Sequence, residues 1–182
     1  MAQTPGTLDD ARLAQLIQRQ LPQITQRLHQ TLEKLQVPRE DNGENSLAAE
    51  VWWAQLQQRY ANDAIAFCPV ELDPAASVPA SLFDSVADNL LHNALVKRQS
   101  ENGLTIRVAL ACDATRMSVC DSGSAVHETL SAELLRAPVL SENGLGIGLY
   151  HAARQAGHCG YELRLASNVD GQVCFELKAN KT

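Results

Sequence analysis

The sequence predicts an α/β fold in which helices cover one side of a mixed sheet, so that the domain has two layers. The first observation is residues 81–98, whose apolar side chains come in pairs one helical turn apart and form a broad buried face. The second is a set of short apolar runs, typical of strands, on both sides of this helix. With 182 residues, 45% of them hydrophobic, the chain can bury such a core.

The N-terminal part predicts a separate helical segment of the kind found in bundles. Apolar residues recur there at spacings of three and four, as in a bundle or coiled-coil seam: Ile17, Leu21, Ile24, Leu28, Leu32 and Leu35. Pro22 should kink this helix, and Val37-Pro38 should end it. We therefore divide the chain into a helical segment (1–38), a linker (39–46) and a main domain (47–182). An amphipathic helix folded back on its own domain is the alternative interpretation.

The elements before the central helix are a helix and a strand. Residues 47–60 predict a helix with Val51, Trp52, Leu56 and Tyr60 facing inward. Asn62-Asp63 should end it, and residues 64–70 are typical of a buried strand.

After the central helix we expect a hairpin, two helices and a second hairpin. Asp113-Ala114-Thr115 predicts a hairpin turn between its two flanking strands, and a second hairpin closes the chain around residues 168–171. The expected elements are strands at 104–111 and 116–120, a short helix at 128–136, a helix at 147–156, and strands at 161–166 and 172–179.

Composition and charge exclude some classes of function. The net charge of −6 and the pI near 5.3 argue against a general nucleic-acid binder, whose surface would be basic. No apolar run reaches the length of a membrane span, and no signal peptide opens the chain, so we expect a cytoplasmic protein attached to a membrane only through regions outside this chain. Free buried thiols, without zinc, are the expected state of the five cysteines, Cys68, Cys112, Cys120, Cys159 and Cys174.

The central helix carries a polar ladder along one edge of its apolar face. Asn89, Asn93 and Lys97 are spaced four residues apart, so each is rotated by only about 40° from the one before. Carboxamides beside a core are costly unless their oxygens are used, and a divalent cation with phosphate oxygens would use them. A boundary helix with solvated asparagines is the alternative.

A carboxylate and a glycine follow at the end of the strand 116–120. The carboxylate of Asp121 can only accept hydrogen bonds, so it could take one from the exocyclic amine of adenine and would repel the carbonyl of guanine. Gly123 lacks a Cβ and would let a ring approach the backbone. An ordinary turn would show the same short pattern.

Three alternating glycines, Gly144, Gly146 and Gly148, lead into the helix that begins around residue 147. Such a turn can present backbone N–H groups to phosphate oxygens. A dinucleotide fingerprint would need glycine at Leu149, and a Walker loop would need Gly-Lys-Ser/Thr, so both are excluded. A glycine-rich packing turn is the alternative.

Together, the three motifs resemble the ATP-binding domain of sensor histidine kinases, a Bergerat-type fold shared with gyrase and MutL ATPases. The motifs are N-x-x-x-N-A, V-C-D-S-G-S-A and N-G-L-G-I-G-L, in this order, and the resemblance covers about residues 47–177. It implies ATP and Mg²⁺ as ligands, Asn89 and Asn93 at the metal, and Asn89 and Lys97 as catalytic residues. The implied nucleotide-binding residues are Asn89, Asn93, Asp121, Gly123, Gly144, Gly146, Gly148 and Leu149. The chain departs from the family at Val96, where a basic residue is usual, and at Ala125, where a glycine is usual.

The resemblance also implies an ATP-dependent protein histidine kinase that transfers the γ-phosphate to a histidine outside this chain or on a partner helix. In the related ATPases a glutamate stands at the position of Asn89 and activates water; asparagine cannot accept a proton, so an imidazole is the expected acceptor. His29 lacks the H-E-x-x-x-P context of the family's acceptor. The segment 1–38 is similar to the second helix of the phosphotransfer hairpin, and the implied partners are that hairpin, a response regulator and a second copy of the protein.

Two other functions share this fold. One is a serine kinase of the anti-sigma type, which would lack the long seam helix. The other is a non-catalytic interaction module that keeps the fold without effective ATP binding. Binding of an ATP analogue with Mg²⁺ separates the second from the kinases, and phosphohistidine formation on an added hairpin separates the two kinases.

Overall fold

The computed structural model describes residues 46–138 and 147–180. This part of the chain contains both helices and strands, as the sequence predicts. In order they are β1 (Ser46–Ala48), α2 (Ala49–Arg59), β2 (Ile65–Phe67), β3 (Ser77–Pro79), α3 (Ala80–Ser100), β4 (Ile106–Leu110), β5 (Arg116–Asp121), α4 (Glu128–Ser131), α5 (Ile147–His158), β6 (Tyr161–Val169) and β7 (Gln172–Ala179).

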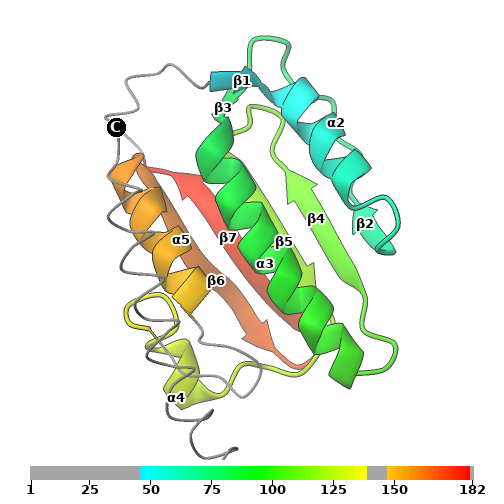
Figure 1. Ribbon diagram of the computed structural model, residues 1–182, viewed down its shortest axis with the longest axis vertical. Helices are drawn as coiled ribbons and strands as arrows, with labels where there is room; N and C mark the ends of the chain where they lie inside the picture. Colours follow the sequence, from blue (N-terminus) through cyan, green and yellow to red (C-terminus); the bar gives the residue numbers. More distant parts are fainter. Residues whose placement is uncertain (1–45, 139–146, 181–182) are drawn as a thin grey trace, which may run out of the picture. The chain divides into compact units, whose positions relative to one another are not determined.

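The main sheet is mixed, as expected. Its strand order is β2-β4-β5-β7-β6. β2 runs parallel to β4, and every other neighbouring pair is antiparallel. Both predicted hairpins, β4–β5 and β6–β7, are present, and β1 pairs with β3 in a small sheet that the sequence analysis missed. The predicted fold class, a two-layer α/β sandwich, is confirmed for the described residues (Figure 1).

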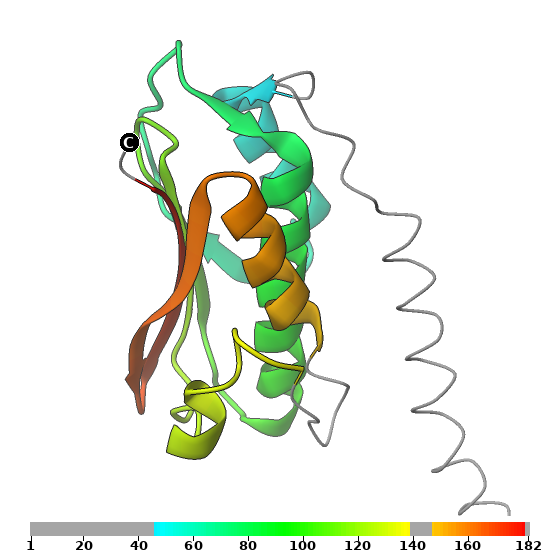
Figure 2. The same ribbon diagram turned by 90° about the vertical axis from the view of Figure 1, so that its left-hand side faces the viewer.

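The helices α3 and α5 lie next to each other over one face of this sheet (Figure 2). The core fills the space between the two layers, and every buried apolar position of α3 belongs to the face predicted from its period. Phe83 is fully buried in this core and makes edge-to-face contacts with Trp52, at 5.2 Å between ring centroids, and with Tyr161, at 5.5 Å.

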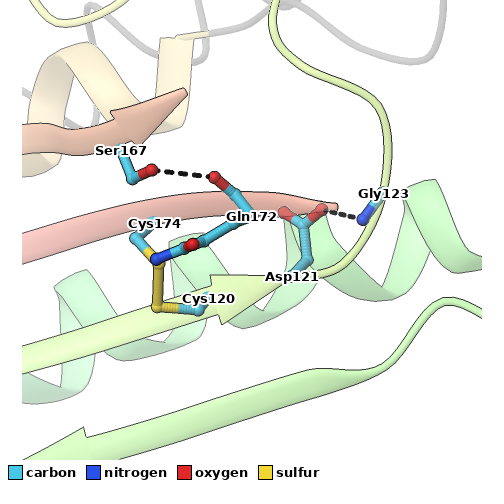
Figure 3. Close-up of a disulfide and its surroundings, with 6 residues drawn as sticks. All are labelled: Cys120, Asp121, Gly123, Ser167, Gln172 and Cys174. Carbon is cyan, nitrogen blue, oxygen red and sulfur yellow. Dashed lines mark hydrogen bonds between the residues drawn. A yellow bond between two sulfur atoms is a disulfide. The ribbon is translucent and has the colours of Figure 1, made fainter. Parts of the chain in front are cut away.

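Alternation along β5 sends neighbouring residues to opposite faces of the sheet. Met117 and Val119 are buried toward the helices, so Asp121, two residues further, points to the same side. Cys120 points to the opposite face, where its partner in the register, Cys174 of β7, forms a disulfide with it (Figure 3). The expectation that all five cysteines are free thiols is therefore wrong for this pair, because antiparallel pairing places two residues 54 positions apart directly opposite each other.

Two details of the predicted elements are also corrected. Val51 is 46% exposed, whereas Trp53, which was not expected to face inward, is buried. The buried positions of α2 are 49, 52, 53 and 56, the i, i+3, i+4, i+7 pattern, and Val51 falls outside it. The helix expected at 128–136 ends at Ser131 and continues as separate turns; none of its four residues is buried, so core packing does not extend it.

Two predicted regions lie outside the described residues. They are the seam helix with its linker up to residue 45, and the segment 139–146 with Gly144 and Gly146. Within the described ranges, no helix has both the length and the apolar character needed to cross a membrane.

Candidate functional site

The candidate site follows one edge of α3, where the predicted polar ladder lies. Asn89 and Lys97 are eight residues apart, which corresponds to about 12 Å along the helix axis at about 1.5 Å per residue. Each end of the ladder touches a different motif: Lys97 bonds to Asp121 at the end of β5, and Asn89 lies against Gly148 in α5. The tertiary structure thus brings residues from all three sequence motifs to one helix edge.

Lys97 lies at one end of this edge. Its Nζ donates to Asp121 Oδ1 at 2.7 Å and to the backbone oxygen of Ser124 at 2.6 Å. Both charged side chains are largely buried, with 22% of Lys97 and 10% of Asp121 exposed. The resemblance implied a catalytic Lys97, but the structure places its ammonium group against the predicted adenine acceptor.

Asp121 has one carboxylate oxygen that binds no described residue. Gly123 N–H also donates to Oδ1, at 2.9 Å (Figure 3). Both hydrogen bonds from described residues therefore end on Oδ1, and Oδ2 has no partner among them. A carboxylate held on one oxygen presents the other as a fixed acceptor.

Gly123 is required for packing within the protein. A Cβ there would lie 2.6 Å from Leu104 Cδ1 and 2.6 Å from Lys97 Cε, and it would also meet Glu101 Oε2. These are atoms of the protein itself, so on that side the glycine permits close packing of the loop against the end of α3. The interpretation that its missing side chain admits a ring is not supported on that side.

Side-chain oxygens accept hydrogen bonds from every backbone N–H group of the loop after β5, residues 123–126. Its four successive backbone N–H groups donate to four different residues: Asp121 Oδ1 (2.9 Å), Glu101 Oε2 (2.9 Å), Asp170 Oδ1 (2.8 Å) and Asn168 Oδ1 (2.7 Å). Asn168 also donates through Nδ2 to the oxygen of Val126 at 2.8 Å. We call this segment the β5 loop.

Two elements on either side of the β5 loop supply these partners. Glu101 is the C-cap residue of α3, and Asn168 and Asp170 belong to the tip of the β6–β7 hairpin. A backbone bond from Gly171 N–H to the oxygen of Gly123, at 2.9 Å, joins the same tip to the loop. Ala125 has no positive φ, so the residue that replaces the family's glycine adopts an ordinary backbone conformation.

The fold alters the ionisation of Glu101, one of the residues that bind the β5 loop. Hydrogen bonds from the Ser124 hydroxyl and the Ser124 N–H, with a smaller contribution from the nearby Lys97 charge, hold the pKa of Glu101 below its usual value of 4.5. Because these bonds stabilise the ionised form, the carboxylate remains charged at neutral pH.

Asn89 occupies the other end of the ladder with a fixed amide. Its Nδ2 donates to the backbone oxygen of Ser85 at 2.7 Å, which requires the nitrogen on that side and turns Oδ1 away from it. Oδ1 is directed to Gly148, where a Cβ would collide with it and would lie 3.2 Å from Asn89 Cγ. The α3–α5 packing therefore leaves room for an amide oxygen only because residue 148 is glycine.

The remaining predicted residues fall in two groups. Asn93, between the two ends, is exposed, and its side chain makes no hydrogen bond to a described residue, so its amide oxygen is available. Leu149 is buried in the hydrophobic core, where it anchors the first turn of α5. No cluster of three or more His, Cys, Asp or Glu side chains that could hold a metal occurs in the described ranges. The amide oxygens of Asn89 and Asn93 stay the predicted metal ligands on this edge.

Sequence reasoning missed the partners of the β5 loop. Asn168, Asp170 and Gly171 were assigned only to a hairpin turn, which their residue types predict. Their bonds to residues more than 40 positions earlier depend on β5 and β7 being neighbours in the sheet. No signal in the sequence alone indicates that contact.

Comparisons with known proteins place the fold. The sequence matches no protein-family model, and no curated protein matches it significantly. Solved structures do match. The catalytic domain of histidine kinase ThkA superposes with a TM-score of 0.58 at 18% identity, covering 75% of this chain and 97% of that one.

Two further histidine kinases are similar in structure. Full-length ShkA, solved in complex with AMPPNP, matches with a TM-score of 0.60 at 20% identity over 73% of this chain and 30% of that longer one. The cytoplasmic segment of QseC matches over 100% of this chain and 99% of its own, with a TM-score of 0.53 at 17% identity. ThkA has also been solved with the response regulator protein TrrA.

The mixed sheet with α3 and α5 on one face defines a two-layer α/β domain. More specifically, the chain has the fold of the catalytic domain of sensor histidine kinases, as the three sequence motifs implied.

Proposed function

We propose that this chain is the ATP-binding catalytic domain of a sensor histidine kinase and that the nucleotide lies along the ladder edge of α3. The observation that carries this proposal is the pair of contacts at the two ends of the ladder, Lys97 with Asp121 and Asn89 with Gly148. Three motifs that are separate in the sequence converge there on one surface with an acceptor at one end and amide oxygens along it.

The charges and hydrogen bonds at the two ends of the site favour placing the base of the nucleotide at the Asp121 end. The four N–H groups of the β5 loop are all used by side-chain oxygens, so none is left for a phosphate. Three of those four partners are carboxylates (Asp121, Glu101 and Asp170), which would repel a phosphate group. The exocyclic amine of adenine, a donor, suits Asp121 Oδ2.

The phosphates would then lie toward Asn89 and the start of α5. The first turn of this 12-residue helix has backbone N–H groups without partners inside the helix, and the helix dipole favours negative charge there. The glycine motif that leads into it, including Gly144 and Gly146, is proposed to contribute further N–H groups.

The residues present fit Mg²⁺, with Asn89 and Asn93 as its ligands. Magnesium takes oxygen ligands and keeps several waters, so one or two protein oxygens suffice. Asn89 Oδ1 is oriented by the bond from Nδ2 to Ser85, and the oxygen of Asn93 is exposed on the next turn. When bound, the ion would neutralise charge on the phosphate oxygens.

The proposed reaction is phosphoryl transfer to a histidine imidazole that is not in this domain. Such transfer depends on positioning and charge neutralisation more than on covalent chemistry by the protein. Asn89 has no group that could take a proton from water, whereas an imidazole is partly neutral at pH 7 and needs no base. Lys97 would act at the base end by fixing Asp121 and the oxygen of Ser124.

The proposed partners are a phosphoacceptor helical hairpin, a response regulator and a second copy of the full-length protein. The complex of ThkA with TrrA supports a response regulator as the type of partner for this fold. Transfer to serine, in an anti-sigma type of kinase, would be distinguished by incubating the domain with Mg·ATP and a hairpin bearing a histidine: acid-labile phosphate on the hairpin supports the histidine kinase.

The decisive experiment is nucleotide binding by calorimetry, with wild type compared with Asp121→Asn. Asparagine keeps one acceptor oxygen for Gly123 N–H, but it replaces the other carboxylate oxygen with an amide nitrogen and removes the negative charge. Binding of adenine nucleotides should therefore be lost while the fold remains intact. Unchanged affinity would refute the adenine assignment, and no binding by wild type would leave a non-catalytic module as the function.

The metal assignment has a separate test in Asn93→Ala. Asn93 is exposed and makes no hydrogen bond to a described residue, so its removal should not cost stability. We expect the affinity for Mg·ATP analogue to fall much more than the affinity for the metal-free nucleotide. Equal losses would remove the metal role.

A further inference from the structure

We propose that Asn168 and Asp170, at the tip of the β6–β7 hairpin, are positioning residues that hold the β5 loop in the conformation that accepts the base. This inference rests on the proposed function, because it concerns the same nucleotide end of the site. It assigns a role to two residues that none of the three motifs includes. They would not touch the ligand but would act through the loop.

The hydrogen bonds show why these two residues control the loop. Asn168 bonds both backbone groups of Val126, accepting from its N–H at 2.7 Å and donating to its oxygen at 2.8 Å. Asp170 accepts from the N–H of Ala125 at 2.8 Å. Two consecutive residues of the loop are therefore fixed from the hairpin tip, and the backbone bond from Gly171 to Gly123 fixes a third.

The C-terminal half of the loop has little else to keep it in place. Residues 122–127 belong to neither a helix nor a strand, and Ser124 and Ala125 in their middle are exposed or half-buried, so little apolar packing orders them. Without the hairpin tip, this half of the loop would sample many conformations, and nucleotide binding would have to supply the free energy of ordering it. A loop ordered in advance avoids this cost.

The tip and Asp121 are mechanically connected through β7. Asp121 pairs with Val173 in the register, only two residues from Gly171, and one residue before it Cys120 is bonded to Cys174 (Figure 3). The hairpin tip, the carboxylate and the β5 loop thus share one short stretch of paired strand. A change at the tip is transmitted to the position of the loop relative to Asp121 Oδ2.

The test compares Asn168→Ala and Asp170→Ala with wild type and with Gln172→Ala, using ADP and a Mg·ATP analogue in calorimetry. Gln172 is an exposed residue of the same hairpin whose side chain makes no hydrogen bond to a described residue, so it is the matched control. We expect each loop variant to bind both nucleotides about tenfold more weakly, the equivalent of about 1.4 kcal/mol, and the control to bind as wild type does. Asp170→Asn keeps an acceptor for Ala125 and should restore nearly full affinity.

A positioning role predicts a pattern that a general loss of stability does not. The loss should be equal for ADP and for the Mg·ATP analogue, since the phosphate end is untouched, and the amide hydrogens of Ala125 and Val126 should exchange faster while those of β5 and β7 do not. If the loop variants bind as tightly as Gln172→Ala, the proposal is wrong and the proposed function stands. The same conclusion follows if affinity falls only together with faster amide hydrogen exchange throughout the domain. If wild type binds neither nucleotide, both are overturned.

Discussion

Gly148→Ala tests the geometry at the proposed metal end of the site, because Gly148 packs directly against Asn89. The new Cβ would overlap Asn89 Oδ1, and the neighbour that can move most cheaply is the amide of Asn89. Rotating it breaks the 2.7 Å bond to Ser85, which costs about 0.5–1.5 kcal/mol. If the amide cannot move, the helices must separate, and overpacking of that kind costs about 1–3 kcal/mol.

The same helix contains a matched control in Gly157. A Cβ there would have nothing within 4 Å, and its φ is not positive. Gly157→Ala should therefore stabilise the protein by about 0.5–1 kcal/mol, because alanine loses less conformational freedom in a helix. Both variants share that gain, so the difference in unfolding free energy between them reports the collision, about 0.5–3 kcal/mol from the two costs above. Urea unfolding followed by circular dichroism measures it.

The collision also has a functional consequence that a double variant can isolate. Displacing Asn89 Oδ1 should weaken binding of the Mg·ATP analogue more than binding of ADP without metal. In an Asn89→Ala background the Cβ added at position 148 meets no oxygen, so Gly148→Ala should then cost no stability, giving a coupling energy between the two sites. Gly148→Ala as stable as Gly157→Ala, or a penalty unchanged by removal of Asn89, would refute this account of the α3–α5 contact.

Two other predictions concern stability. Reducing the Cys120–Cys174 bond, which joins residues 54 positions apart in sequence, should lower the unfolding free energy by about 4 kcal/mol in the chain-entropy description. The stability of the control variant, Cys120→Ser/Cys174→Ser, should not change on addition of reductant. Equal urea midpoints for oxidised and reduced wild type would contradict the prediction. Because the fold lowers the pKa of Glu101, its stabilising contribution is present above pH about 4.5 and disappears as pH falls through the lower folded pKa. The stability gap between wild type and Glu101→Gln should accordingly narrow as the pH is lowered from neutral through that range, and a gap independent of pH would exclude the Ser124 contact as its cause.

Much of the architecture could be predicted from local patterns. The period of residues 81–98 predicted α3 and its buried face, and alternation with turn residues predicted both hairpins. The edge strands β1 and β3 have three residues each, too few to show a period, and were missed. Val51 was misplaced because a hydrophobic residue adjacent to the buried stripe of α2 cannot be separated from it by composition alone.

At the candidate site, the difference between what local sequence patterns predict and what the tertiary structure decides is clearer. Spacing on one helix was enough to place Asn89, Asn93 and Lys97 on a common edge, and the end of a strand was enough to single out Asp121, because these are relations within single elements. The contacts between elements were decided by the tertiary structure. They are the ion pair of Lys97 with Asp121, the packing of Asn89 against Gly148, the Cys120–Cys174 disulfide and the hydrogen bonds between the β5 loop and the β6–β7 tip. The physical reason is that each of these contacts depends on which strands are neighbours and in which register, and that choice is made by burial of the whole core, whereas the period of an isolated segment carries no information about its partners.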